Sequence, residues 1–117
     1  MDEGWWVVLS RPVSVESAEE IARHLKVIGQ PVRVRLIETL DRVGAASVGE
    51  LADAVGVSIT DASQHLKILR EGGIVARRQN GRHGVYQLVA PARVLAIYDQ
   101  VAADLHARAA ERPPELL

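Results

Sequence analysis

Apolar side chains recur at spacings of three and four residues in five segments of this chain, which is the periodicity of amphipathic helices. Two strand-like runs lie between the fourth and fifth segments, and they flank Asn80-Gly81, a dipeptide typical of a tight hairpin turn. The pattern therefore predicts the order helix, helix, short bridge, helix, helix, hairpin, helix. The predicted helices cover residues 17–28, 31–43, 47–55, 58–71 and 91–112.

Capping residues mark where these helices begin and end. Ser17 with Glu20, and Ser47 with Glu50, have the spacing of a capping box, in which each residue can satisfy a backbone N–H of the other. Gly56 suits the left-handed position after the third helix, and only two residues follow it before the fourth. Such a short, glycine-containing connection is typical of a helix-turn-helix.

The register of the hairpin follows from its turn. If Asn80-Gly81 forms a two-residue turn, Val75 lies opposite Tyr86, and this apolar pair faces the domain. Arg78 and Arg82 then gather near the tip. Like charges at one tip are unfavourable unless a counter-charge such as a phosphate approaches them.

The apolar stripes also indicate which helices have an apolar face without a predicted partner in the same chain. The second helix begins at Pro31 and turns Arg33, Arg35 and Arg42 away from its apolar stripe. The first and last helices each carry an apolar stripe, but little of the helix-turn-helix or the hairpin is left for them to cover. These two stripes either form a homodimer interface or close over the chain's own core.

The composition is that of one folded domain. The 117 residues are 48% hydrophobic and 25% charged, and no apolar run approaches the roughly 20 residues of a membrane span. The start of the chain lacks the layout of a signal peptide. We therefore expect a cytoplasmic protein without a membrane partner. The absence of cysteine excludes disulfides, thiolate metal sites and thiol redox sensing.

Charge is divided unevenly along the chain. The formal net charge is −1, but residues 58–88 carry five basic and two acidic groups, a net of +3. Residues 1–57 and 89–117 carry net charges of −3 and −1. Concentrated positive charge on one helix and hairpin is either an electrostatic footprint for phosphate or a solvated charged face.

The domain organisation is simple. Residues 1–16 form an N-terminal arm, residues 17–112 the folded domain, and residues 113–117 a tail. Trp5 and Trp6 in the arm open a short strand, pack against the domain or a partner chain, or belong to a partly disordered start.

Both the order of elements and three segments resemble the ArsR family of winged helix-turn-helix transcriptional repressors. This resemblance implies a mainly α fold with a small β-hairpin, order α-α-(β)-α-α-β-β-α, and a homodimer built on the terminal helices. It also implies that the dimer binds a palindromic double-stranded DNA operator until an effector releases it. The matching segments are IGQPVRVRLIETL (28–40), VGELADAVGVSITDASQHLKILREGGIV (48–75) and RRQNGRHGVYQL (77–88).

Metal sensing, for which the family is best known, is not supported by the residues. A single histidine falls on the family's metal-ligand positions, whereas zinc needs three or four donors. Asp99 and His106 share a helix face and could meet their symmetry mates across a dimer, or could be solvated. We therefore expect no metal or cofactor. The sequence leaves open whether a small-molecule effector binds and which one it is. The family positions are Ser47, Gly49, Ala90, Ala92, Ala103 and His106.

The resemblance places the fourth helix in the major groove, the only groove that admits a helix and shows a full code of donors and acceptors. Gln64 is the best candidate for reading a base, because its amide can pair bidentately with adenine. Ser63 and Thr60 can donate to base edges or phosphates. Ser58 can cap the helix, contact a phosphate, or do both.

The remaining candidates are expected at the DNA backbone, with one alternative left open for His65. Lys67, a flexible point charge, suits a phosphate. His65 either contacts the backbone or forms a hydrogen bond within the domain that sets the helix angle. Arg78 and Arg82 are the predicted wing contacts, whereas Arg77 can pair with an acidic side chain.

Three rival functions remain. An enzyme is disfavoured, because the chain has no nucleophile elbow, phosphate-binding glycine loop or carboxylate pair at a useful spacing. A winged-helix module used only for protein contacts is a second possibility. The third is an autorepressor that binds DNA without effector control.

Overall fold

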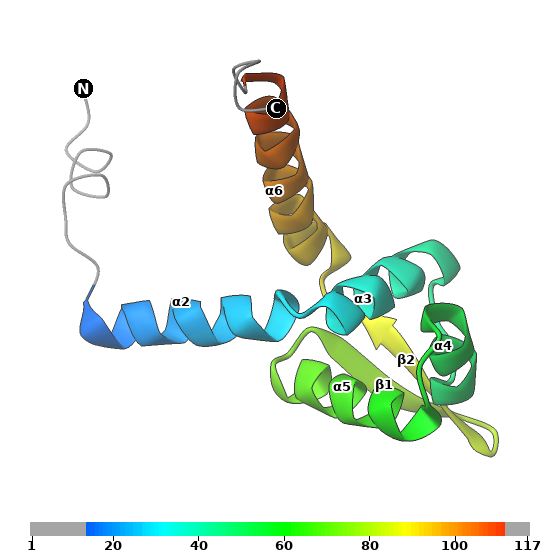
Figure 1. Ribbon diagram of the computed structural model, residues 1–117. Helices are drawn as coiled ribbons and strands as arrows, with labels where there is room; N and C mark the ends of the chain where they lie inside the picture. The colour runs from blue at the N-terminus through cyan, green and yellow to red at the C-terminus, as the bar shows by residue number, and fades with distance from the viewer. Residues whose placement is uncertain (1–13, 112–117) are drawn as a thin grey trace.

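The computed structural model describes residues 14–111 and confirms the winged helix-turn-helix fold (Figure 1). The proposed Trp5-Trp6 arm and the tail at 113–117 lie outside the described residues, apart from the last three residues of the arm. The elements are α2 (Val15–Ile28), α3 (Pro31–Val43), α4 (Val48–Val55), α5 (Ile59–Glu71), β1 (Val75–Asn80), β2 (His83–Leu88) and α6 (Pro91–Glu111).

The first helix begins two residues earlier than the sequence pattern suggests. Ser14 has an extended backbone, and its Oγ accepts a hydrogen bond from the Ser17 N–H at 3.1 Å, so Ser14 is the N-cap. The prediction that Ser17 caps this helix is therefore wrong. Two serines three residues apart compete for the role, and the first of them wins.

The signals around the helix-turn-helix are confirmed. The Ser47 N–H donates to Glu50 Oε1 at 3.0 Å, and the Glu50 N–H donates to Ser47 Oγ at 3.2 Å, which completes the capping box. Hydrogen bonds to the Glu50 carboxyl from the backbone N–H of Ser47 and from its hydroxyl hold the pKa of this carboxyl below its ordinary value. Gly56 ends α4 with a φ of +72°, in the left-handed region that glycine adopts without strain.

The core lies where α3, α4 and α5 meet the hairpin. Apolar side chains from every element of this body close it, and the first turn of α6 contributes one more. A short bridge also joins Ala46, between α3 and α4, to Tyr86 of β2. The largest fully buried side chains are those of Ile28, Leu36, Ile37, Leu40, Leu51, Leu66, Leu69 and Val75.

The hairpin register differs from the predicted one. Asn80 pairs with His83, so the two turn residues are Gly81 and Arg82, and Val75 pairs with Leu88 rather than Tyr86. Gly81 takes the positive φ of +66° and Arg82 does not, which is the pattern of a type II′ turn. Because the register moves by two residues, the same side chains still face inward.

The C-terminal carbonyls of α2 are satisfied by side chains of α3 and α6, because a helix end has no partners of its own for them. Arg33 donates from Nε to the Val27 carbonyl at 2.6 Å and from Nη2 to the Lys26 carbonyl at 3.1 Å. The Tyr98 hydroxyl donates to the Ile28 carbonyl at 2.5 Å, and burial raises the pKa of Tyr98 to about 12. The expectation that Arg33 points away from the core is therefore wrong.

Beyond these contacts, α2 and α6 extend away from the body of the domain (Figure 1). Every residue of α6 after Tyr98 is exposed. Several of the exposed side chains are large and apolar, among them Ile21 and Leu25 on α2 and Val101 and Leu105 on α6. Within the part of the chain that the structure describes, no helix is long and apolar enough to cross a membrane.

Candidate nucleic-acid interface

The helix α5 has one buried and one exposed face. Ala62, Leu66 and Leu69 are fully buried against the body. Thr60, Gln64 and Lys67 lie on the opposite side of the helix, since they are separated from the buried set by about half a turn, and all three are exposed. Their side chains are therefore free to contact a ligand that approaches α5 from outside. Ser63 is also exposed and lies on the flank that faces the hairpin.

Ser58 is the N-cap of α5. Its Oγ accepts a hydrogen bond from the Asp61 N–H at 3.0 Å, which fixes the start of the helix. The capping alternative is therefore observed, and the exposed hydroxyl stays beside the positive end of the helix dipole.

His65 forms a hydrogen bond within the domain, which is one of the two roles that the sequence left open for it. Its Nδ1 lies 3.0 Å from Nη1 of Arg33. A guanidinium can only donate, so Nδ1 is the acceptor and the proton of the neutral ring is on Nε2. Partial burial and the positive charge of Arg33 lower the pKa of His65. This contact ties α5 to α3, whose Arg33 also holds the end of α2; a backbone contact from His65 stays a prediction.

Lys67 has a weak partner of its own. Its Nζ lies 4.0 Å from Glu71 Oε1, one turn further along α5, and both side chains are largely exposed. Exposed pairs of this kind contribute only about 0.3–0.5 kcal/mol. The ammonium can therefore leave Glu71 for a phosphate at little cost.

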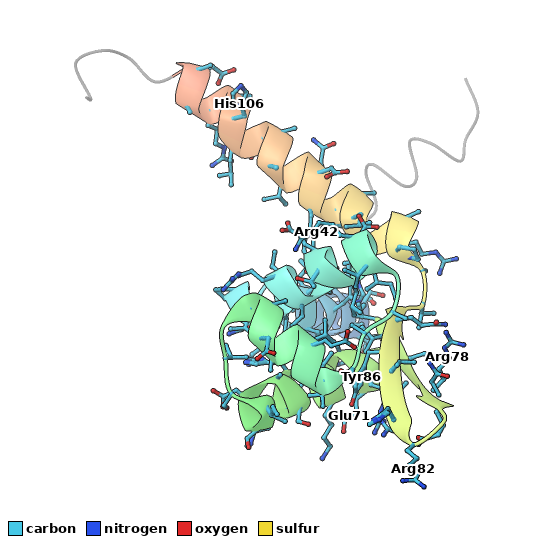
Figure 2. The ribbon with its side chains drawn as sticks, turned by 90° about the vertical axis from the view of Figure 1, so that its right-hand side faces the viewer. Arg42, Glu71, Arg78, Arg82, Tyr86 and His106 are labelled. Atoms are coloured by element: carbon cyan, nitrogen blue, oxygen red, sulfur yellow. The ribbon has the colours of Figure 1, made fainter. Side chains whose placement is uncertain are left out.

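The two predicted wing residues point away from the body (Figure 2). Arg82 occupies the turn itself, and Arg78 extends from the outer face of β1 opposite Val85. Gln79 stabilises the turn, because its Nε2 donates to the Gly81 carbonyl at 3.2 Å. Neither arginine has an ion-pair partner among residues 14–111.

An ion pair of Arg77 with an acidic side chain was one option from the sequence, but the described residues contain no such pair. It shares the inward face of the hairpin with its cross-strand partner Tyr86. Its guanidinium lies flat on Gly84, where a Cβ would come within 2.2 Å of Nη2. Gly84 lies inside strand β2, and a glycine within a strand often marks a site where another group approaches the backbone closely. The sequence therefore contained a signal for this contact.

Arg77 thereby enters an open groove between the wing, α5 and the start of α4. Ser63, Ser47 and Arg82 also line this groove. The hairpin, α5 and the start of α4 therefore meet here, and two arginines and two hydroxyls line the same groove.

Among residues 14–111, no three His, Asp or Glu side chains are close enough to hold a metal ion. His106 and Asp99 both lie on the exposed part of α6.

Comparison with known proteins agrees with this geometry. Residues 28–78 match the model of a helix-turn-helix domain family. The chain is 40% identical over 80 residues to the biofilm growth-associated repressor of Xylella fastidiosa, covering 68% of this chain and 69% of that protein.

Solved structures of similar proteins have the same fold. The crystal structure of Rv0081 from Mycobacterium tuberculosis superposes with a TM-score of 0.73 at 33% identity, over 83% of this chain and 99% of that one. The homodimeric winged helix-turn-helix domain of Mb0332 from Mycobacterium bovis, described as a possible ArsR-family regulator, gives 0.67 at 29% identity, over 84% and 93%. The chain thus belongs to the ArsR family of winged helix-turn-helix transcriptional regulators.

Proposed function

We propose that this regulator is a repressor that reads a palindromic DNA operator as a homodimer. The observation that carries the proposal is one surface, which we call the reading head: the exposed face of α5 together with the wing formed by β1 and β2. The exposed polar face of α5 adjoins a wing whose arginines have no carboxylate partner among residues 14–111. The chain as a whole has a net charge of −1, so cations concentrated on this one surface favour contact with phosphates. The phosphates would lie on both sides of one DNA groove.

In this proposal each side chain has a distinct role. Gln64 reads a base edge in the major groove, and Thr60 and Ser63 contact base edges or nearby phosphates. Lys67 and the wing arginines Arg78 and Arg82 bind phosphates, which position the protein without reading sequence.

The homodimer would form through α2 and α6. An apolar groove lies between the end of α2 and the middle of α6, lined by Leu25, Ile97, Val101 and Leu105 among others. These side chains would be covered by the same helices of a second copy. The similar domain of Mb0332 is itself described as homodimeric. Two reading heads related by a twofold axis require half-sites about 10 bp apart, centre to centre. The protein would act in the cytoplasm, where bacterial DNA lies.

Arg82→Ala tests the wing contact. We expect weaker binding to operator and random DNA alike, because a phosphate contact carries no sequence information. The dimer would lose two contacts, so the slope of log affinity against log salt should flatten by about two. Titrations by fluorescence anisotropy at several salt concentrations measure this slope. An unchanged slope would remove Arg82 from the interface.

Gly84→Ala tests whether the placement of Arg77 matters for DNA binding. The substitution leaves every charge in place and needs no unusual backbone, since Gly84 does not have a positive φ. The new Cβ would displace the guanidinium from the groove. If Arg77 binds a phosphate there, each protomer loses a hydrogen bond to a charged group, which contributes about 1.5 kcal/mol. The operator affinity of the dimer should therefore fall roughly a hundredfold.

The control is the same substitution in an Arg77→Ala background. A glycine that acts only by placing Arg77 should cause no further loss there. An equal loss in both backgrounds would show that Gly84 acts on the hairpin in another way.

A further inference from the structure

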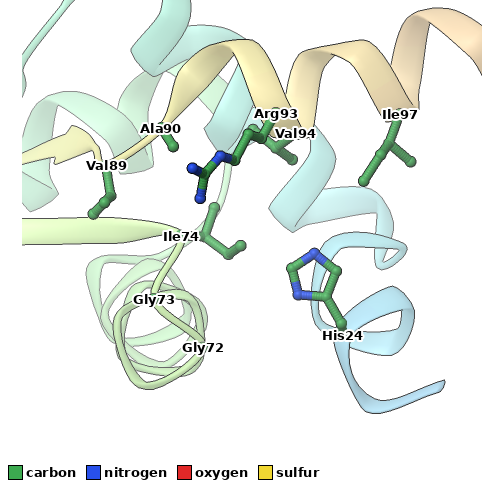
Figure 3. Close-up of a pocket in the computed structure, with 9 residues that line it drawn as sticks. All are labelled: His24, Gly72, Gly73, Ile74, Val89, Ala90, Arg93, Val94 and Ile97. Atoms are coloured by element: carbon green, nitrogen blue, oxygen red, sulfur yellow. The ribbon is translucent and has the colours of Figure 1, made fainter. Parts of the chain in front are cut away.

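A small pocket lies where the two long helices leave the reading head (Figure 3). Its walls come from α2, from the Gly72-Gly73 junction between α5 and β1, and from the start of α6. The pocket is separate from the DNA-facing side of α5. It borders the apolar groove between α2 and α6 described above, with which it shares Ile97. No residue of the proposed DNA contacts lines it.

The floor of the pocket is apolar. Ile74 and Val94 are 8% and 3% exposed, and Ile97 is partly buried beside them. The cavity volume is about 170 Å³. That is below the roughly 300–1,000 Å³ of pockets for drug-sized ligands, and close to the ~150 Å³ of a protein cavity known to hold benzene. A ligand that fills this volume would have an apolar body about the size of one benzene ring.

Two polar side chains face this floor. Figure 3 shows Arg93 and His24 both extending toward Ile74, from α6 and α2 respectively. Neither has an ion-pair or side-chain hydrogen-bond partner among residues 14–111. The guanidinium carries a permanent charge, and an imidazole has at least one N–H to donate in either protonation state.

The position of Arg93 has no explanation in helix stability. It lies in the first turn of α6, which contains no acidic residue, and a cation there opposes the helix dipole. An anion in the pocket would offset the positive charge of Arg93 and the positive end of the helix dipole. Its carboxylate could accept two parallel hydrogen bonds from the guanidinium, the geometry for which arginine is best suited.

We infer that this pocket binds a small monocarboxylate with a ring-sized apolar body, held by Arg93 and His24. If the proposed DNA-binding function is correct, this ligand is also an effector. It would tie α2 and α6 to Gly72-Gly73, the end of the reading helix, and so alter the angle between the dimerising helices and the reading head. The spacing of the two reading heads depends on that angle.

Benzoate and benzamide form a matched pair of probes, because they share a ring and differ in charge. Titration of the free protein, followed by calorimetry and by amide chemical shifts, should show benzoate binding at least about tenfold more tightly, as a charge-assisted hydrogen bond implies. Arg93→Gln should reduce benzoate affinity to the level of benzamide and leave benzamide affinity unchanged. The shifts should cluster around Ile74, Val94 and His24.

Three results would overturn the site: no measurable benzoate binding, equal affinity for the two probes, or benzoate affinity unaffected by Arg93→Gln. None of these measurements needs DNA, so they stand whether or not the proposed function is correct. The effector role is tested separately on an operator. Saturating benzoate should change operator affinity by at least about fivefold, and operator should change benzoate affinity by the same factor. Unchanged operator affinity would overturn the effector role.

Discussion

Replacement of Arg33 by alanine is expected to lower the free energy of unfolding by about 3 kcal/mol, because a buried set of charge-assisted hydrogen bonds is lost. Arg33 is only 8% exposed and donates to two carbonyls at the end of α2 and to the ring of His65. The substitution leaves all three acceptors without this donor. Chemical denaturation followed by circular dichroism measures the loss.

The charge of Arg33 is balanced without a carboxylate. The two carbonyls that it contacts, those of Lys26 and Val27, lie in the last turn of α2, where the helix dipole favours a cation. One side chain thus joins α2, α3 and α5. We therefore expect Arg33→Ala to weaken DNA binding as well, although Arg33 does not lie on the exposed face of α5.

Arg33→Lys is the matched control, since it keeps the charge but not the planar fork of donors. It should recover part of the lost stability, because an ammonium can reach some of the three acceptors but not hold all of them in the observed geometry. If Arg33→Ala costs less than about 1 kcal/mol, the ordinary value of a single hydrogen bond, the role assigned to this network is wrong.

Gln64→Ala is expected to abolish much of the discrimination between operator and random DNA. A bidentate amide–adenine pair contributes about 1–3 kcal/mol of discrimination, and a dimer makes it twice. The ratio of operator to random affinity should therefore fall at least about tenfold, with little change in the affinity for random DNA. Competition titrations with both DNAs measure this ratio.

Lys67→Ala is the comparison on the same face of α5. It should weaken both affinities together, because a phosphate contact is the same on every sequence. An equal loss on operator and random DNA for Gln64→Ala would count against a base contact from Gln64.

Local signals predicted most of the fold. Pro31 and Gly44 bound α3 at the expected residues, and the capping box of Ser47 and Glu50 starts α4 as expected. Each of these features depends on a few neighbouring residues and therefore survives in the sequence. The same holds for the polar face of α5, since helical periodicity alone separates Gln64 from Leu66.

The remaining features depend on contacts between distant segments. Arg33 looked like an ordinary surface arginine, because its acceptors on α2 and α5 become neighbours only in the fold. The hairpin register could not be predicted either, since Gly81 can be the second residue of one two-residue turn or the first of another. The groove position of Arg77 followed from that register and from Gly84.

Selection of bound fragments from random and genomic DNA, followed by footprinting of the enriched sequences, tests the central claim most directly. A dimer that reads sequence through α5 predicts an imperfect inverted repeat with half-sites about 10 bp apart, centre to centre. Protection should extend over both half-sites on one face of the duplex. The absence of any enriched sequence at low salt, or an enriched single half-site without a repeat, would contradict the account.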